Sequence, residues 1–139
     1  MESADIVKAI RDKFEEYGNI AQIPFIKKGR GSFEAKLLTT GIEVNNLDGE
    51  PFLPWEVFTE TISLLQRNGG RAARGNAIGP RLGDPELTLN SVEGYIAHKV
   101  FGKQVGEIVF RRVTPIACIL IWVGLCRHGV GELILNNSI

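Results

Sequence analysis

The sequence predicts an α+β fold in which a small antiparallel sheet packs against about four helices, all within a single domain of residues 1–139. Three observations predict this class. Apolar residues recur at three- and four-residue steps in several segments, which is typical of amphipathic helices. Between residues 22 and 47 the spacing changes to short alternating stretches separated by turns, which is typical of strands. A chain of 139 residues that is 44% hydrophobic and 23% charged also has the size and composition of one globular domain.

The first helix is expected over residues 4–17, where Ile6, Ile10 and Phe14 repeat at four-residue steps and Gly18 can end the helix. Strands are expected over 22–47, as two or three antiparallel segments separated by glycine-containing turns. Pro24 has no N–H to donate, so the first of these stretches is expected to be an edge strand or the lead-in to one.

The second helix is expected over residues 54–68, because a proline is tolerated in the first turn and Phe58, Ile62 and Leu65 follow at helical spacing. Residues 67–90 are expected to form a long glycine- and arginine-rich connection. Such a connection is uncommon in a compact domain unless it is functional or mobile.

The third helix is expected over residues 91–101, with Asn90 and Glu93 approximating a capping box at its start. The next segment, 105–113, fits either a helix or a strand, and periodicity does not decide between them. The fourth helix is expected over 114–125, where apolar residues on every side indicate a central position. A last strand is expected over 132–136, with the earlier sheet as a candidate partner.

The charges are unevenly distributed although the net charge is zero. Residues 1–66 contain seven basic and eleven acidic side chains, whereas residues 67–112 contain eight basic and four acidic ones. A neutral chain can therefore still present a basic face, and the middle third is where we expect it. The longest apolar run is too short for a transmembrane helix and the N-terminus lacks a secretion signal, so we expect a cytoplasmic protein with no membrane partner.

The segment from Arg67 to Arg81 is the most unusual part of the sequence, since it contains four arginines and four glycines but no acidic residue. Glycines let a backbone approach a phosphate closely, and guanidinium groups match phosphate oxygens geometrically. The segment lacks the Lys-Ser/Thr pair of a P-loop, so it does not predict a nucleoside triphosphate. The plainer alternative is a solvated loop whose arginines keep it soluble.

Two further basic features support the same interpretation. Residues 96–113 outline a helix-turn-helix, with a first helix, a turn at Gly102 and a second helix that carries Arg111 and Arg112. The turn glycine falls one position later than in the usual motif. A smaller basic turn precedes the strand at residue 33. The candidate nucleic-acid-binding residues are therefore Lys27, Lys28, Arg30, Arg67, Arg71, Arg74, Arg81, Arg111 and Arg112.

These features lead us to expect a noncatalytic nucleic-acid-binding domain, with double-stranded DNA as its partner and with no cofactor and no metal. The first alternative is a protein-interaction or self-associating scaffold, in which the acidic and basic parts of two copies would pair. The second alternative is a metal-dependent nuclease that uses Glu34 and Lys36 on a predicted strand, although no aspartate lies just upstream. The sequence thus favours a protein that is not an enzyme.

Overall fold

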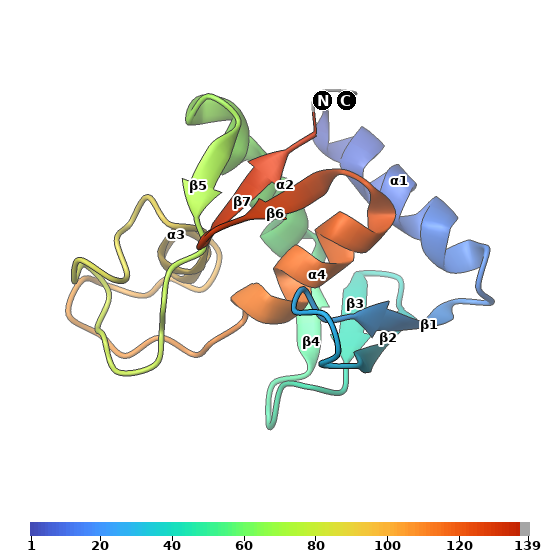
Figure 1. Cartoon of the computed structure of the whole chain (residues 1–139), viewed down its shortest axis with the longest axis horizontal. Coiled ribbons are helices and arrows are strands. Elements are labelled where there is room, and N and C mark those ends of the chain that lie inside the picture. Colours follow the sequence, from blue (N-terminus) through green and yellow to red (C-terminus); the bar gives the residue numbers. More distant parts are fainter. Residues whose placement is uncertain (137–139) are drawn as a thin grey trace.

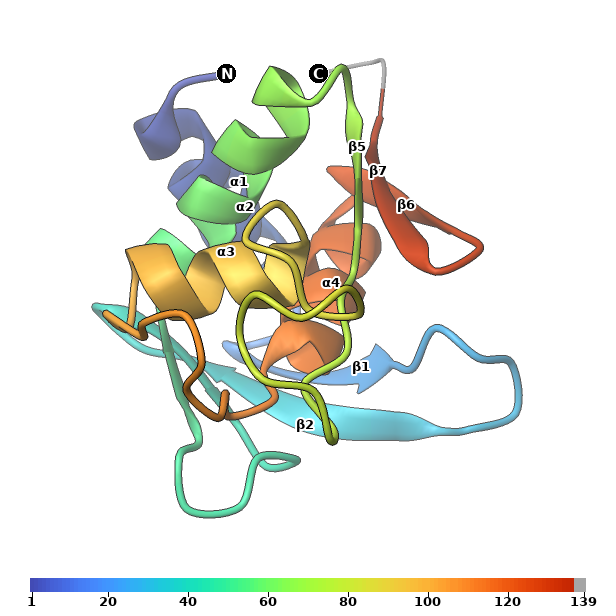
Figure 2. The same ribbon diagram turned by 90° about the vertical axis from the view of Figure 1, so that its left-hand side faces the viewer.

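The computed structural model describes residues 1–136 and confirms the α+β class, with four helices and two antiparallel sheets in the described part of the chain. The first sheet has the order β1-β2-β3-β4 and the second the order β5-β7-β6. Both sheets lie against α4, one on each side of it (Figures 1 and 2). The bounds are α1 Ser3–Glu15, β1 Ile20–Pro24, β2 Ser32–Leu37, β3 Gly41–Val44, β4 Phe52–Pro54, α2 Trp55–Arg67, β5 Arg71–Ala73, α3 Val92–Lys99, α4 Val113–Val123, β6 Cys126–Gly129 and β7 Glu132–Leu135.

The core follows the apolar periodicity of the sequence. Helix α1 buries Ile6, Ile10 and Phe14 on one face, as its four-residue spacing predicts. Helix α4 is apolar on every side and has seven buried residues, and it ends where Gly124 adopts a left-handed φ of 95°. The central position predicted for this helix is therefore confirmed.

The four-stranded sheet is larger than the two or three strands that we expected, because β4 adds a fourth strand at the edge opposite β1. Strand β2 alternates buried and exposed residues, so the sheet has one face on the core and one face in solvent. Strand β1 contains Pro24 and lies at an edge of the sheet, as predicted.

The last predicted strand exists as β7 but does not join the first sheet. It pairs with β5 on one side and with β6 on the other. Both partners lie where no strand was expected, β5 inside the 67–90 connection and β6 directly after the last helix. A hairpin with its tip at Val130 joins β6 to β7, and this tip reaches the mouth of the cleft described below.

The helix-turn-helix prediction is wrong. Helix α3 ends at Lys99, and residues 105–112 form neither a helix nor a strand. Gly102 and Gly106 adopt φ values of 69° and 93°, which a helix does not permit, and the segment bonds instead to the preceding loop through Leu82. This part of the chain therefore offers no recognition helix that could enter a DNA groove.

None of the four helices described in residues 1–136 combines the length and apolar character needed to cross a lipid bilayer.

Candidate functional site: a basic cleft between two sheets

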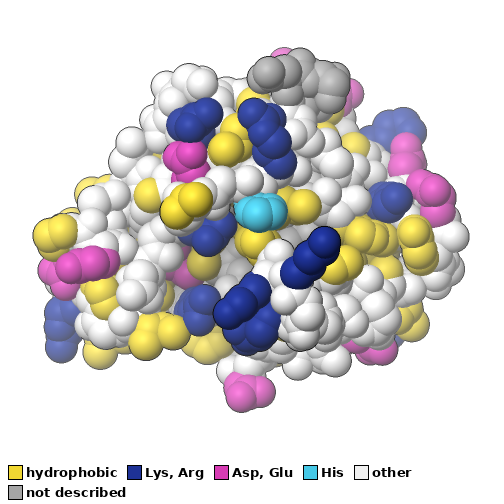
Figure 3. All heavy atoms as spheres, in the orientation of Figure 1, with side chains coloured by type: hydrophobic (Ala, Val, Ile, Leu, Met, Phe, Trp, Pro, Cys, Tyr) yellow, Lys and Arg dark blue, Asp and Glu magenta, His cyan; other side chains and the backbone are white. Residues whose placement is uncertain are grey.

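A cleft of about 860 Å³ opens where loops from both sheets meet the first turn of α4. One wall comes from the β1–β2 turn and the β3–β4 loop, and the other comes from the segment after β5 and the tip of the β6–β7 hairpin. Thr114, Pro115 and Cys118 of α4 line the cleft between these walls. Figure 3 shows this face, on which dark-blue basic side chains gather around the hollow.

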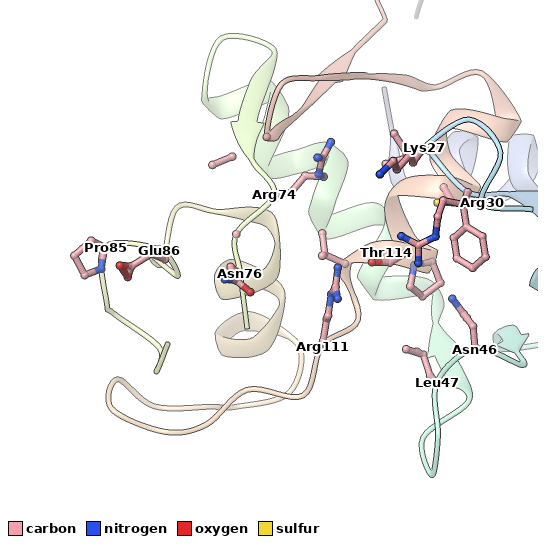
Figure 4. A pocket seen from close by; sticks show the side chains of 18 residues that line it. Lys27, Arg30, Asn46, Leu47, Arg74, Asn76, Pro85, Glu86, Arg111 and Thr114 are labelled. Carbon is pink, nitrogen blue, oxygen red and sulfur yellow. The ribbon is translucent and has the colours of Figure 1, made fainter. Parts of the chain in front are cut away.

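Four basic side chains line the cleft, and they come from three separate parts of the chain: Lys27, Arg30, Arg74 and Arg111. Figure 4 shows them arranged around the same opening. Within the part of the chain that the structure describes, Glu86 is the one acidic residue in the cleft lining. Low-dielectric walls concentrate the field of charges that line a concave surface, so this arrangement favours an anion.

None of these four cations forms an ion pair with a carboxylate in the described residues. The three ion pairs found within residues 1–136 lie elsewhere, at Lys8–Asp12, Arg71–Glu132 and Arg112–Glu50. Lys27, Arg30 and Arg111 are exposed to solvent, and Arg74 is half-buried. Their donors are therefore available to a ligand that carries negative charge.

The position of Arg74 follows from long-range backbone bonds. Its N–H donates to the carbonyl oxygen of Gly131 at 2.9 Å, and its own carbonyl accepts from the N–H of Glu93 at 2.9 Å. Its guanidinium donates to two backbone carbonyls of the β6–β7 hairpin, Gly129 at 3.4 Å and Glu132 at 3.2 Å. These bonds hold the side chain at the cleft wall without neutralising its charge.

Gly75 lets this segment pack closely on the start of α3. It has a φ of 83°, and a Cβ atom added there would lie 2.7 Å from the Ser91 hydroxyl oxygen and 3.2 Å from the Cβ of Glu93. A larger residue at position 75 would therefore push the Arg74 segment away from the helix. Gly75 is thus needed for backbone packing, whereas a Cβ atom added at Gly69, Gly70 or Gly79 would meet no atom within 4 Å.

Glu93 is the residue that sequence reasoning placed in the wrong role. The N-cap of α3 is Ser91, whose hydroxyl accepts the N–H of Gly94 at 3.2 Å, so the capping box with Asn90 does not form. Glu93 is instead buried, with 2% of its surface exposed, and its carboxylate accepts the backbone N–H groups of Arg112 at 2.9 Å and Val113 at 3.1 Å. It therefore ties the Arg74 segment to the Arg111–Val113 segment, and both segments contribute residues to the cleft lining.

Burial raises the pKa of Glu93 to about 6, because desolvation of the carboxylate outweighs the two N–H donors and the positive charges of Arg111 and Arg112. The group that connects the two segments is consequently partly protonated in mildly acidic solution.

The remaining predicted binding residues do not line this cleft. Lys28 is exposed on the same turn as Lys27 but is outside the cleft lining. The guanidinium of Arg67 lies over the ring of Tyr95, at 4.9 Å from its centroid, and Arg81 donates to the carbonyl of Gly106. Arg71 is paired with Glu132 at 2.9 Å.

Arg112 was a candidate phosphate ligand, but it is buried and does not line the cleft. Only 6% of its surface is exposed. Its guanidinium binds Glu50 and lies 3.7 Å from the ring centroid of Phe101 and 4.8 Å from that of Phe110. A guanidinium that is enclosed and paired in this way is part of the protein interior.

Glu34 and Lys36 lie on β2, as predicted, but both point to the exposed face of the sheet and neither lines the cleft. Residues 1–136 contain no group of three or more His, Cys, Asp or Glu side chains that could hold a metal ion. The described structure therefore adds nothing in favour of the nuclease alternative.

No family model, curated protein or solved structure matches this chain. We therefore infer the function from the geometry of the cleft itself.

Proposed function

We propose that this protein is a noncatalytic nucleic-acid-binding domain that holds phosphate groups in the basic cleft. The observation that supports the proposal most strongly is the convergence of Lys27, Arg30, Arg74 and Arg111 on one cleft, with no carboxylate partner among residues 1–136. Ordinary surface cations are solvated singly or paired with nearby acids, whereas four unpaired cations around a hollow form an electrostatic footprint for a polyanion.

Guanidinium groups are suited to this task because their donors match phosphate oxygens in pairs. Contacts of this kind would give affinity and orientation without base discrimination. Residues 100–112 contain no recognition helix that could read a DNA groove, and the proposal includes no sequence-specific base contacts. We also propose a cytoplasmic location, as the sequence led us to expect.

The test is a comparison of two double variants that lose the same charge. Arg30→Ala with Arg111→Ala removes two cleft cations, and Lys36→Ala with Arg81→Ala removes two cations outside the cleft. Binding of fluorescein-labelled twelve-nucleotide strands and duplexes would be measured by anisotropy between 50 and 300 mM NaCl, a range chosen to resolve the salt dependence.

We expect the cleft variant to bind at least about tenfold more weakly, and the slope of log K against log salt to fall by about 1.5 to 2, because two phosphate contacts are lost. The control variant should retain most of its affinity and its slope. Equal losses in both variants, or no binding of either oligonucleotide by the unchanged protein, would contradict the proposal.

The scaffold alternative has one observation in its favour, since Ile78, Val105 and Ile108 are each more than 60% exposed on the loops around α3. Pairing between an acidic and a basic part of two copies is less favoured, because Lys27 and Arg30 belong to the acidic first half of the chain and yet line the basic cleft. Size-exclusion chromatography at 50 and 500 mM NaCl tests it, since electrostatic association is screened by salt. A salt-sensitive oligomer that binds neither oligonucleotide would favour the scaffold.

A further inference from the structure

The cleft carries apolar side chains on the same wall as two of its cations. Phe25 and Ile26 immediately precede Lys27, and Leu47 comes from the neighbouring β3–β4 loop. All three apolar residues are only half-buried, although they also pack against the core. The ring of Phe25 is supported from behind by Phe33, with the two ring centroids 5.2 Å apart. A supported aromatic ring beside cations is the combination by which proteins hold unpaired bases.

Two carboxamides add hydrogen-bonding groups to this lining. Asn46 adjoins Leu47 on the apolar wall, and Asn76 lies on the opposite wall. Asn76 accepts the backbone N–H of Ile78 at 2.9 Å through its oxygen, which orients its NH₂ group as the remaining donor. The side-chain oxygen of Asn46 is buried and has no hydrogen-bond partner among the described residues. The NH₂ group of Asn76 can therefore bond to the edge of an accessible base, whereas the Asn46 oxygen is enclosed.

The form of the cleft distinguishes a single strand from a duplex. Its volume of about 860 Å³ lies in the range of roughly 300–1,000 Å³ that is typical of ligand sites, which suits a short stretch of one strand. A duplex keeps its bases stacked inside and presents its phosphates outward, so its bases could not reach Phe25 or Leu47. A duplex would then contact only the cations at the rim of the cleft.

From this arrangement we infer that the ligand is single-stranded nucleic acid, with phosphates on the four cleft cations and at least one unstacked base against Phe25 and Leu47. The inference rests on the proposed function, because it assigns the ligand class of the same cleft. It differs from the double-stranded DNA that the sequence suggested, because Phe25 and Leu47 in the cleft lining suit bases that are not paired.

The test compares three twelve-nucleotide ligands on the unchanged protein: a thymidine strand, an abasic strand with the same phosphodiester backbone, and a duplex. Anisotropy at one fixed salt concentration gives the three affinities. We expect the thymidine strand to bind at least about fivefold more tightly than the abasic strand, because each base stacked on an aromatic ring adds a comparable factor. We also expect the thymidine strand to bind more tightly than the duplex.

Phe25→Leu locates the base contact, because leucine keeps the apolar packing on Phe33 but removes the aromatic face. The matched control is Phe52→Leu, since Phe52 is 38% exposed on β4 and lies outside the cleft lining. We expect Phe25→Leu to weaken binding of the thymidine strand several-fold and to leave the abasic strand unchanged, whereas the control should change neither. If Phe25→Leu does not fold, the comparison of the three ligands on the unchanged protein still shows whether a base contributes to binding.

The possible outcomes separate this inference from the proposed function. If the duplex or the abasic strand binds as tightly as the thymidine strand, through cleft cations, the inference is overturned while the proposed function stands. If no oligonucleotide binds, both are overturned.

Discussion

Arg111 and Arg112 are neighbours in the sequence, yet they belong to two regions of opposite character. Arg111 is exposed, has no ion-pair partner in residues 1–136 and lines the basic cleft. Arg112 is almost entirely buried in a cluster with Glu50, Phe101 and Phe110, which we call the Arg112 cluster. The guanidinium of Arg111 is thus exposed at the cleft, whereas the guanidinium of Arg112 is enclosed in the protein interior.

The difference between the two regions shows how burial decides the role of a charged side chain. An enclosed guanidinium is tolerated only where a carboxylate and aromatic faces replace its hydration. An exposed one costs little and can exchange water for phosphate. Glu93 holds the backbone next to both arginines, because its carboxylate accepts the N–H groups of Arg112 and Val113. We therefore expect substitutions in the Arg112 cluster to change stability and those in the cleft to change binding.

The largest effect is expected for Arg112→Ala. The substitution removes the contacts with two phenylalanine rings and the pair with Glu50, and it leaves a cavity in a buried position. We expect the free energy of unfolding to fall by about 3 kcal/mol, as measured by urea denaturation with circular dichroism. Glu50→Gln is the companion variant, because it removes the carboxylate charge but keeps the packing of the Arg112 side chain, so its stability loss should be smaller than that of Arg112→Ala. A stability loss below about 1 kcal/mol in Arg112→Ala would remove the distinction between the two regions.

A smaller effect is expected from the titration of Glu93. Its pKa is raised from 4.5 to about 6 in the folded protein, so the folded state binds the proton more tightly than the unfolded state does. The stability from this group is therefore fully present below about pH 4.5 and is lost as the pH rises through about 6. The change amounts to about 2 kcal/mol over this window.

The measurement is the free energy of unfolding of the unchanged protein and of Glu93→Gln at intervals between pH 4 and 7. Other carboxyl groups titrate in both proteins, so the difference between the two curves isolates Glu93. We expect that difference to change across the window because glutamine has no proton to lose. Two parallel curves would show that Glu93 has the same pKa in the folded and unfolded states.

The smallest effect on stability is expected for Arg111→Ala. Since Arg111 is exposed and unpaired among the described residues, the free energy of unfolding should change by less than about 0.5 kcal/mol. Its positive charge also lowers the pKa of Glu93, so the variant should shift the Glu93 titration upward. A clear loss of stability at pH 7 would indicate that Arg111 belongs to the interior together with Arg112.

The elements that the sequence predicted correctly are those with a strong period. Helices α1, α2, α3 and α4 begin and end within two residues of the expected bounds, because each carries an apolar stripe or an apolar run bounded by glycine or proline. Strands β5 and β6 were missed for the opposite reason. They are three and four residues long, and their sequences, Arg-Ala-Ala and Cys-Arg-His-Gly, contain no alternating β-branched or aromatic residues. Pairing with the apolar β7 makes them strands.

The candidate site was predicted only in part. Four of the nine expected cations line the cleft, and no local pattern distinguishes Lys27 from Lys28 or Arg111 from Arg112. Phe25 and Asn46 were missed because an apolar or amide residue at the end of a strand has many ordinary roles. Glu93 carried a signal, namely a carboxylate at a helix start, but the helix it caps with backbone bonds is the next one along the chain.

By itself the sequence determined the α+β class, the four helices and the central position of α4, because burial of apolar residues follows the period of the local backbone. Only the tertiary structure decided which positive side chains meet. The cleft joins positions 27, 30, 74 and 111, and these positions are brought together by long-range bonds such as those of Arg74 with Gly131 and Glu93. Charge contributes little to choosing the fold, so the arrangement of the charges is a consequence of how the apolar core and the backbone hydrogen bonds are satisfied.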